Sequence, residues 1–521
     1  MAPYPASQHP TMTLLPYRLS LFFLLLAITL PFLGAHHYLP IATFHQEWLA
    51  GMFGLTSLLP LALVRDERPW EIPRTALLPL ALIILAWVQF ATNSKVLFES
   101  VVLFSLYLVW AFSLMLAACR IETTLGRECM ADTLAWSLLT GALLLALTGA
   151  LQHWAPWIDQ AYVFRGNGSG SINGNIAQAN SFADYLWIGI VSALYLNGRG
   201  RLGGAPLWLL LPVLIGFSLM SGSRSVYFFA AALSAWLGLW AWLQAGPKRR
   251  SLIRSALLLV PFLLAVQWLI ENSGTPVSSA QRLVAQGSYD SVRFTLWRAA
   301  ITIFSEHPFL GAGYDSYSRE FFERIAQFPI NGAGIPEHSH NLLTEMLAEF
   351  GLAGFGLVLG TGLLWLHALR RYRGDDPVFL ALGVLLVLGI HSGLEYPLWY
   401  AHFLAIAVLM LALGEGKRWS LAFAPRHRYA LAGIALVGGV VLLNLRGDYM
   451  QLEAAAQGRN SNGQYMTAET QHEWLLNAYS KSLWRYYAAL QFAARMPIEA
   501  KDTGARVKVM EEALHFSPIR Q

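Results

Sequence analysis

Residues 206–245 read PLWLLLPVLIGFSLMSGSRSVYFFAAALSAWLGLWAWLQA. Two apolar segments, at about 206–222 and 224–245, meet here with almost no loop between them, and each is long enough to cross the roughly 30 Å hydrocarbon core of a bilayer. Similar segments recur along most of the 521 residues. Charged residues make up only 13% of the chain, whereas a soluble domain carries roughly 25%. The sequence therefore predicts an all-α polytopic membrane protein with about 12 or 13 transmembrane helices.

Thirteen apolar segments can be marked, and one of them can be re-entrant or interfacial. The eleven others lie at about 18–36, 46–64, 75–93, 96–118, 132–152, 180–196, 252–270, 350–369, 377–393, 398–414 and 428–445. The first could also be a signal peptide that ends near Gly34, but we take it as a retained helix.

The positive charges orient these segments. With the N-terminus inside, the inner connections hold nineteen Lys and Arg, whereas the short outer connections hold three, which are Lys95, Arg165 and Arg224. The positive-inside rule therefore predicts a cytoplasmic N-terminus. The net charge of +5 is explained by this distribution, so we expect no nucleic-acid partner. The two cysteines, Cys119 and Cys129, have no CxxC or zinc-type spacing and exclude a disulfide scaffold.

This marking divides the chain into four parts. Residues 1–270 hold transmembrane helices 1 to 9, and residues 350–446 hold the C-terminal transmembrane helices. Residues 271–349 form a large outer loop, and residues 447–521 form a small outer tail with helical apolar spacing. The loop contains a predicted amphipathic helix around Arg293 and the His motif, and it carries five arginines that the inside rule does not count: Arg282, Arg293, Arg298, Arg319 and Arg324.

Unusual polar clusters gather on the outer side of this topology. They are Asn173–Asn180, Ser221–Arg224, Arg293–Arg298, His338–Asn341 and His391–Pro397. A transporter is expected to carry polar residues at the centres of its helices, but these segments have few charges in their middles. The distribution favours chemistry at the outer surface over transport through the membrane.

Arg224 and Arg293 each allow two interpretations. An arginine at the mouth of two helices is often an interfacial residue that extends to the lipid headgroups, and a helix lying on the membrane resembles the Arg293 segment. The alternative is anion binding, because the guanidinium offers a planar fork of donors that matches phosphate oxygens. The Ser-Gly-Ser turn before Arg224 adds backbone N–H groups at the start of a helix.

The histidines His338 and His340 precede a helix on which Asn341, Glu345 and Glu349 recur every four positions. Such a pair can be exposed loop residues, metal ligands or a general base. A histidine above a stripe of carboxylates suits a general base, since its ordinary pKa of about 6.5 lies near working pH. The outer loops contain no Asp-x-Asp or Glu-x-Asp pair, so we expect metal-free chemistry and no cofactor.

Taken together, these motifs resemble the superfamily of bacterial O-antigen ligases, O-antigen polymerases and protein O-oligosaccharyltransferases. The likeness spans roughly residues 160–404. It rests on Gly174–Asn180, Ser221–Arg224, the Arg293–Trp297 helix followed by His307–Gly313, His338–Asn341 with Glu349–Leu352, and His391–Tyr400. The Gln178–Asn180 and Glu395–Tyr400 pieces look most like the pilin glycosylation ligases, although O-antigen ligases can share both.

The resemblance implies transfer of a whole glycan from an undecaprenyl pyrophosphate carrier, at the periplasmic face of the bacterial inner membrane. The acceptor would be Ser or Thr of a pilin or other exported protein, or alternatively the lipid A core in lipopolysaccharide biosynthesis. Lesser alternatives are an O-antigen polymerase and a lipid-linked glycan transporter. The family arrangement puts Arg224 and Arg293 on the pyrophosphate and His340, with His338 second, near the acceptor, and inversion is expected.

Five further residues are candidates for substrate contact or for bracing the loops: Gln178, Asn180, Glu345, Glu395 and Tyr396. Bracing is the favoured interpretation for Gln178, Asn180, Glu395 and Tyr396. The tail, which ends at Gln521, is shorter than expected for many protein-glycosylating members, and this leaves the acceptor open between protein and lipid A core.

Overall fold

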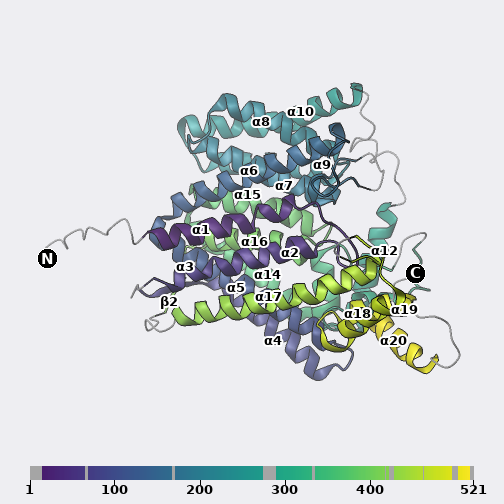
Figure 1. The fold of residues 1–521 in the computed structure, drawn as a ribbon. Coiled ribbons are helices and arrows are strands. Elements are labelled where there is room, and N and C mark those ends of the chain that lie inside the picture. Colours follow the sequence, from purple (N-terminus) through teal and green to yellow (C-terminus); the bar gives the residue numbers. More distant parts are fainter. Residues whose placement is uncertain are drawn as a thin grey trace.

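The computed structural model describes residues 14–64, 68–166, 171–273, 289–330, 335–372, 374–416, 418–421, 428–460, 463–495 and 503–516. These residues form a bundle of helices (Figure 1). In the first half of the chain the helices are α1 (Leu15–Ala27), α2 (Phe44–Thr56), α3 (Leu58–Ala62), α4 (Leu77–Thr92), α5 (Phe98–Leu125), α6 (Arg127–Trp154), α7 (Ala179–Gly198), α8 (Gly204–Met220), α9 (Ser225–Trp242) and α10 (Gly246–Asn272). In the second half they are α12 (Tyr289–Glu306), α13 (Tyr317–Glu323), α14 (Leu342–Leu369), α15 (Asp376–Ser392), α16 (Ala401–Gly414), α17 (Arg428–Gln457), α18 (Ala468–Lys481), α19 (Arg485–Arg495) and α20 (Thr503–Phe516).

All thirteen predicted apolar segments coincide with helices, and the second is divided between α2 and α3. Within the described residues, eight helical stretches are long and apolar enough to cross a membrane: 15–33, 74–92, α5, α6, α9, α10, 342–372 and 429–457. The helices α8, α15 and α16 are apolar but shorter. The predicted class, an all-α polytopic membrane protein, is confirmed.

Helix α7 occupies the interior of the bundle. Its residues are buried without interruption from Ser181 to Leu196, and it packs against α6, α8 and α15. The contact with α6 is so close at Gly189 that an added Cβ would lie 2.4 Å from the Ala142 Cβ. Because α7 is packed on its sides by other helices, these contacts determine where its first residues lie, at one mouth of the bundle.

The predicted inner connections meet at one end of the bundle. There, β1 (Trp70–Pro73) pairs antiparallel with β2 (Arg418–Leu421), which joins two distant connections. Ion pairs link the neighbouring connections, namely Arg127–Asp375, Arg199–Glu128, Lys248–Asp376 and Arg418–Glu122. Helices α7 and α15 lead from this positive end to the opposite mouth, where the polar clusters lie.

Helix α14 bends at Gly351, which has φ +60° and ψ −157°. Residues 308–313 fill the bend: the Leu352 N–H donates to the Pro308 carbonyl (2.8 Å), and the Gly313 N–H donates to the Glu349 carbonyl (3.0 Å). A Cβ on Gly351 would lie 2.6 Å from the carbonyl group of Phe309, so only glycine fits this positive-φ position. The bend separates the polar first turns of α14 from its apolar remainder.

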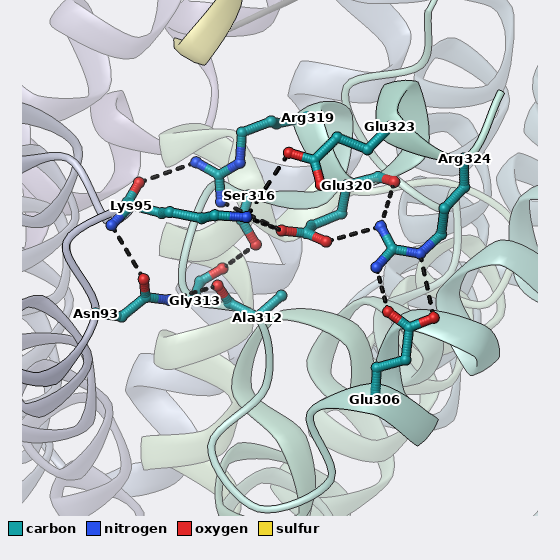
Figure 2. A network of polar contacts seen from close by, with 10 residues as sticks. All are labelled: Asn93, Lys95, Glu306, Ala312, Gly313, Ser316, Arg319, Glu320, Glu323 and Arg324. Carbon is teal, nitrogen blue, oxygen red and sulfur yellow. Dashed lines mark hydrogen bonds and ion pairs between the residues drawn. The ribbon is translucent and has the colours of Figure 1, made fainter.

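An ion-pair network joins α12, α13 and the α4–α5 connection in the loop that the sequence predicts to be on the outer side (Figure 2). The buried Glu320 accepts from Arg324 at 2.8 Å, and it lies 3.5 Å from Arg319 and 3.7 Å from the Lys95 Nζ. Arg324 also pairs with Glu306 at the end of α12. Two of the loop arginines are therefore partners of a buried carboxylate, which accounts for part of the basic content noted in the sequence.

The remaining loop arginines differ in placement. The Arg298 guanidinium lies over the Phe328 ring, 6.0 Å from its centroid. Arg293 belongs to the candidate site described below, and Arg282 lies outside the described residues.

The C-terminal tail is helical, as predicted. Helix α17 continues through residue 447 to Gln457, α18 to α20 follow it (Figure 1), and α20 packs against α13. Tyr449 of α17 stacks on Phe44 of α2, with ring centroids 3.7 Å apart, and Trp484 donates its indole N–H to the Leu445 carbonyl at 2.9 Å. The tail thus has a small apolar core of its own that also takes in the start of α2.

Candidate functional site

Glu395, which follows α15, lies at the centre of a group of polar side chains at the mouth of the bundle opposite the positive end. Its Oε1 accepts from the Asn180 Nδ2 (2.9 Å) and from the Arg293 Nη2 (2.8 Å), while its Oε2 lies 2.5 Å from the His340 Nδ1. The four side chains come from α7, α12, the loop before α14 and the loop after α15. The structure therefore brings together four of the residues that the sequence analysis singled out.

Glu395 is held as an anion. Burial alone would raise the pKa of its carboxyl, but the hydrogen bond and charge of His340, together with the charge of Arg293, hold that pKa below its usual value. An ionised carboxylate has acceptor sites only, so the His340 Nδ1 must carry the proton of their hydrogen bond. In the neutral form of His340, the Nε2 is therefore the nitrogen with the free lone pair.

Backbone geometry fixes the position of His340. This residue has φ +55°, a left-handed conformation that is unfavourable for a side chain with a Cβ. Asn341 follows it as the N-cap of α14: its Oδ1 accepts from the Leu343 N–H (2.9 Å), and its Nδ2 donates to the Gly393 carbonyl (2.9 Å). The cap ties this loop to the end of α15, so His340 is placed beside Glu395 by two elements. Its side chain remains 30% exposed.

His338 has a different carboxylate partner. Its Nδ1 lies 2.9 Å from the Glu345 Oε1, and the Ser339 N–H donates to the Glu345 Oε2 at 2.6 Å. Burial would lower the pKa of His338, but the hydrogen bond and the charge of Glu345 raise it to about 9. His338 is therefore a cation near neutral pH and cannot accept a proton. Of the two histidines, His340 is the one suited to act as a base.

Asn180 connects Glu395 to the turn that contains Arg224. The Asn180 Oδ1 accepts from the Ser223 Oγ (2.6 Å), and the Ser223 and Ser225 hydroxyls lie 2.6 Å apart. Arg224 follows directly, as the half-buried N-cap residue of α9. The predicted arginine thus belongs to a turn that is hydrogen-bonded into the same network as Arg293 and His340.

Gln178 and Tyr396 contact residues around the site. The Gln178 side chain caps α7 by accepting from the Ser181 N–H at 2.5 Å. The Tyr396 ring lies 4.6 Å from the ring of His338 and 5.1 Å from that of His340, measured between centroids. Burial raises the pKa of Tyr396 to about 12, so its phenol keeps its proton at neutral pH. These contacts favour the bracing interpretation for both residues.

Three polar residues near the site were missed by the sequence analysis. Asp184 of α7 lies 3.3 Å from the Nδ1 of His391, and both side chains are buried in the bundle. Gln89 of α4 donates to the Leu310 and Glu349 carbonyls, at 2.6 and 2.7 Å. An Asp or Gln within an apolar segment is the signal that could have found them, since a polar group at that depth requires a partner.

Asp315 is the third of these residues. It has φ +62°, and its carboxylate accepts from the Ser100 hydroxyl at 2.6 Å. Burial raises the pKa of Asp315 to about 6, although the Ser100 hydrogen bond opposes the increase. The glycines at 311 and 313, just before it, are the signal that this segment makes an unusual turn.

Chemically, the site combines an oriented imidazole with fixed positive charge. A carboxylate that holds one nitrogen of a histidine leaves the other nitrogen available as a general base, which is the logic of hydrolase triads. Arg293 uses one of its five N–H donors in the bond to Glu395 that is described above, so the guanidinium can also meet an anion. Such a site suits the activation of a hydroxyl beside an anionic leaving group.

Comparison with known proteins agrees with this class of site. The family model described as O-antigen ligase matches residues 207–359, and the model described as virulence factor membrane-bound polymerase, C-terminal, matches residues 379–521. A general O-oligosaccharyltransferase of Acinetobacter baylyi is 26% identical over 406 residues, which cover 75% of this chain and 68% of the relative. An O-antigen ligase of Pseudomonas aeruginosa is 26% identical over 269 residues, half of this chain and 57% of that relative.

The fold and these similarities indicate a multi-pass membrane protein. The chain is similar to bacterial O-antigen ligases and protein O-oligosaccharyltransferases. The resemblance inferred from the sequence motifs is confirmed at this level.

Proposed function

We propose that the chain is an oligosaccharyl ligase of the bacterial inner membrane. It transfers a glycan as a unit from undecaprenyl pyrophosphate to an acceptor hydroxyl at the periplasmic face. The observation that carries the proposal is the contact of His340 and Arg293 with the same carboxylate, Glu395, at the mouth of an apolar bundle. In this proposal the polyprenyl chain lies against the apolar helices, which would place its phosphates at the depth of the membrane interface.

In the proposed reaction, the Nε2 of His340 takes the proton of the acceptor hydroxyl. The hydroxyl oxygen forms a bond to the anomeric carbon while the bond from that carbon to the pyrophosphate oxygen breaks. Arg224 and Arg293 stabilise the negative charge that develops on the departing pyrophosphate, which fixed cations can do without a metal ion. A single displacement of this kind inverts the anomeric configuration.

The preferred acceptor is Ser or Thr of a pilin or another exported protein. The alignment with a general O-oligosaccharyltransferase covers more of this chain than the alignment with an O-antigen ligase does, 75% against 50%. Transfer to the lipid A core is the second candidate, because the O-antigen ligase model matches the loop that holds Arg293 and His340.

The test supplies the purified full chain with lipid-linked glycan and either pilin or lipid A core. Removal of a general base lowers the rate by about 10²–10⁴-fold, and removal of a group that stabilises developing charge lowers it by about 10²–10³-fold. We expect losses of these sizes for His340→Ala, Arg293→Ala and Arg224→Ala. Arg298→Ala is the matched control, because it removes an exposed arginine from the same helix as Arg293.

Equal transfer by Arg293→Ala, His340→Ala and the unaltered chain would overturn the site assignment. Product on pilin alone supports protein glycosylation, whereas product on lipid A core alone moves the assignment to lipopolysaccharide maturation. A ladder of lengthening glycans without added acceptor would identify a polymerase, and movement of the carrier across the membrane without product would identify a transporter.

A further inference from the structure

A second cluster of titratable side chains is built from elements other than those of the candidate site. His36 lies in the connection after α1, His45 lies in the first turn of α2, and Glu453 lies near the end of α17. The His36 Nε2 is 3.0 Å from the Glu453 Oε1, and the His45 Nε2 is 3.4 Å from both carboxylate oxygens. One ligand atom from each residue can be chosen so that all three lie within 4.8 Å of one another.

Glu453 requires positive charge. Its side chain is only 7% exposed, and a buried carboxylate is costly unless a cation or hydrogen bonds compensate it. Within the described parts of the chain, its ion-pair partners are the two imidazoles of His36 and His45. A divalent cation bound by all three side chains supplies the missing charge without requiring either imidazole to be protonated.

The donor atoms fit such a cation. In a tetrahedral zinc site the ligand bonds are about 2.0–2.2 Å long, which places the ligand atoms about 3.3–3.6 Å apart. The two observed distances from imidazole nitrogen to carboxylate oxygen, 3.0 and 3.4 Å, are close to this value. The His36 side chain is 44% exposed and can rotate to close the remaining separation from His45.

We propose that His36, His45 and Glu453 form a structural site for a divalent cation of the zinc class, with water at its fourth position. Two imidazoles and one carboxylate suit borderline metals such as Zn²⁺ rather than Mg²⁺ or Ca²⁺, which prefer oxygen ligands alone. The proposal is independent of the proposed function, because none of these three residues contacts Glu395 or His340 in the hydrogen bonds described above.

The site would join the C-terminal tail to the membrane bundle. Beside Glu453 on α17, the Tyr449 hydroxyl accepts from the Ile41 N–H (3.0 Å) and donates to the Ile41 carbonyl (2.9 Å). On the other side, the His37 Nε2 lies 2.7 Å from the carbonyl of Asn175, which precedes α7. The bound cation would therefore fix the connection after α1 between the tail and the segment that leads to Asn180.

The experiment uses the full chain in detergent, treated with a chelator and then desalted. Zn²⁺ is added in competition with a chromogenic chelator, and the melting temperature is measured with and without Zn²⁺. We expect one tightly bound equivalent and a rise in melting temperature for the unaltered chain. His36→Ala, His45→Ala and Glu453→Gln should each bind Zn²⁺ at least about tenfold more weakly and lose the thermal effect, as expected when a ligand is removed.

His472→Ala is the matched control, because His472 is an exposed tail histidine outside the cluster, and it should bind Zn²⁺ like the unaltered chain. His36→Ala keeps the test decisive if Glu453→Gln fails to fold, since His36 is the most exposed of the three side chains. Binding by His36→Ala that equals that of the unaltered chain would overturn the proposal. A loss of Zn²⁺ binding in His472→Ala as large as the loss in the three ligand variants would also overturn the proposal.

Discussion

His338 and His340 are two residues apart, and each pairs with a carboxylate, yet the groups around the two carboxylates differ. The Glu345 carboxylate is hydrogen-bonded to His338 and to the backbone N–H of Ser339. The Glu395 carboxylate is hydrogen-bonded to the side chains of His340, Arg293 and Asn180. The arginine offsets much of the charge that His340 meets, while His338 faces Glu345 without a comparable partner in the contacts described. The raised pKa of His338 leaves a positive charge on that residue, and for this reason the proposed reaction uses His340 as the base.

The pKa of His338 predicts how stability depends on pH. Because the folded-state pKa is raised from 6.5 to about 9, the bound proton stabilises the fold fully below pH 6.5, and this contribution is lost as the pH rises through about 9. A shift of this size corresponds to roughly 3 kcal/mol. We expect the difference in melting temperature between the unaltered chain and Glu345→Gln to be largest near pH 6.5 and to shrink towards pH 9 and above.

Thermal unfolding in detergent at several pH values between 6 and 10 measures this difference. His338→Gln should show the same trend, since it removes the titrating group itself. A difference that stays constant across this range would contradict the assignment of the raised pKa to the pair of His338 and Glu345.

At the scale of elements, the bend of α14 determines where the His motif lies. The first turns of the helix carry Glu345 and Glu349, and the apolar remainder begins after Gly351. Residues 308–313 hydrogen-bond to both sides of the bend, so the loop from α12 and the His motif are positioned by one joint. The similarity of His307–Gly313 to the family pattern thus has a structural explanation at this site.

Gly351→Ala tests this joint. The new Cβ would lie 2.6 Å from the backbone of Phe309 and of Gly311, and the residue would keep an unfavourable φ of +60°. A substitution of Gly by Ala at a positive φ costs more than about 1 kcal/mol even without such contacts. We therefore expect a clear drop in melting temperature and loss of ligase activity, measured on the purified chain.

Gly356→Ala, in the same helix, is the matched control. A Cβ at this position meets nothing within 4 Å, and alanine favours helix over glycine by roughly 0.5–1 kcal/mol. The control should be as stable as the unaltered chain or slightly more stable. If both substitutions had equal effects, the bend would not be the constrained joint inferred here.

At the scale of the whole molecule, hydropathy and charge predicted the helices and the class of protein. Apolar length is a local property, so every marked segment could be found without tertiary information. The partners of the buried polar residues could not be predicted in this way, because they are far apart in the sequence. Glu395 and Asn180 are separated by 215 positions, and His36 and Glu453 by 417. Periodicity shows which residues share a helix face, but it does not show which faces pack together. The pairing of His391 with the buried Asp184 was missed for the same reason.

The orientation of the molecule can be tested with its own cysteines. Cys129 is exposed at the start of α6, at the positive end of the bundle, and Cys119 is buried. Ser305 is exposed on α12, which carries Arg293 at the other mouth. The positive-inside rule places the first end in the cytoplasm. The probe is a membrane-impermeant maleimide applied to spheroplasts. We expect it to label a Ser305→Cys variant that lacks Cys129 while the membrane is intact. In the unaltered chain, we expect it to label Cys129 only after the membrane is opened. The reverse pattern would place His340 and Arg293 on the cytoplasmic side, where a periplasmic acceptor could not reach them.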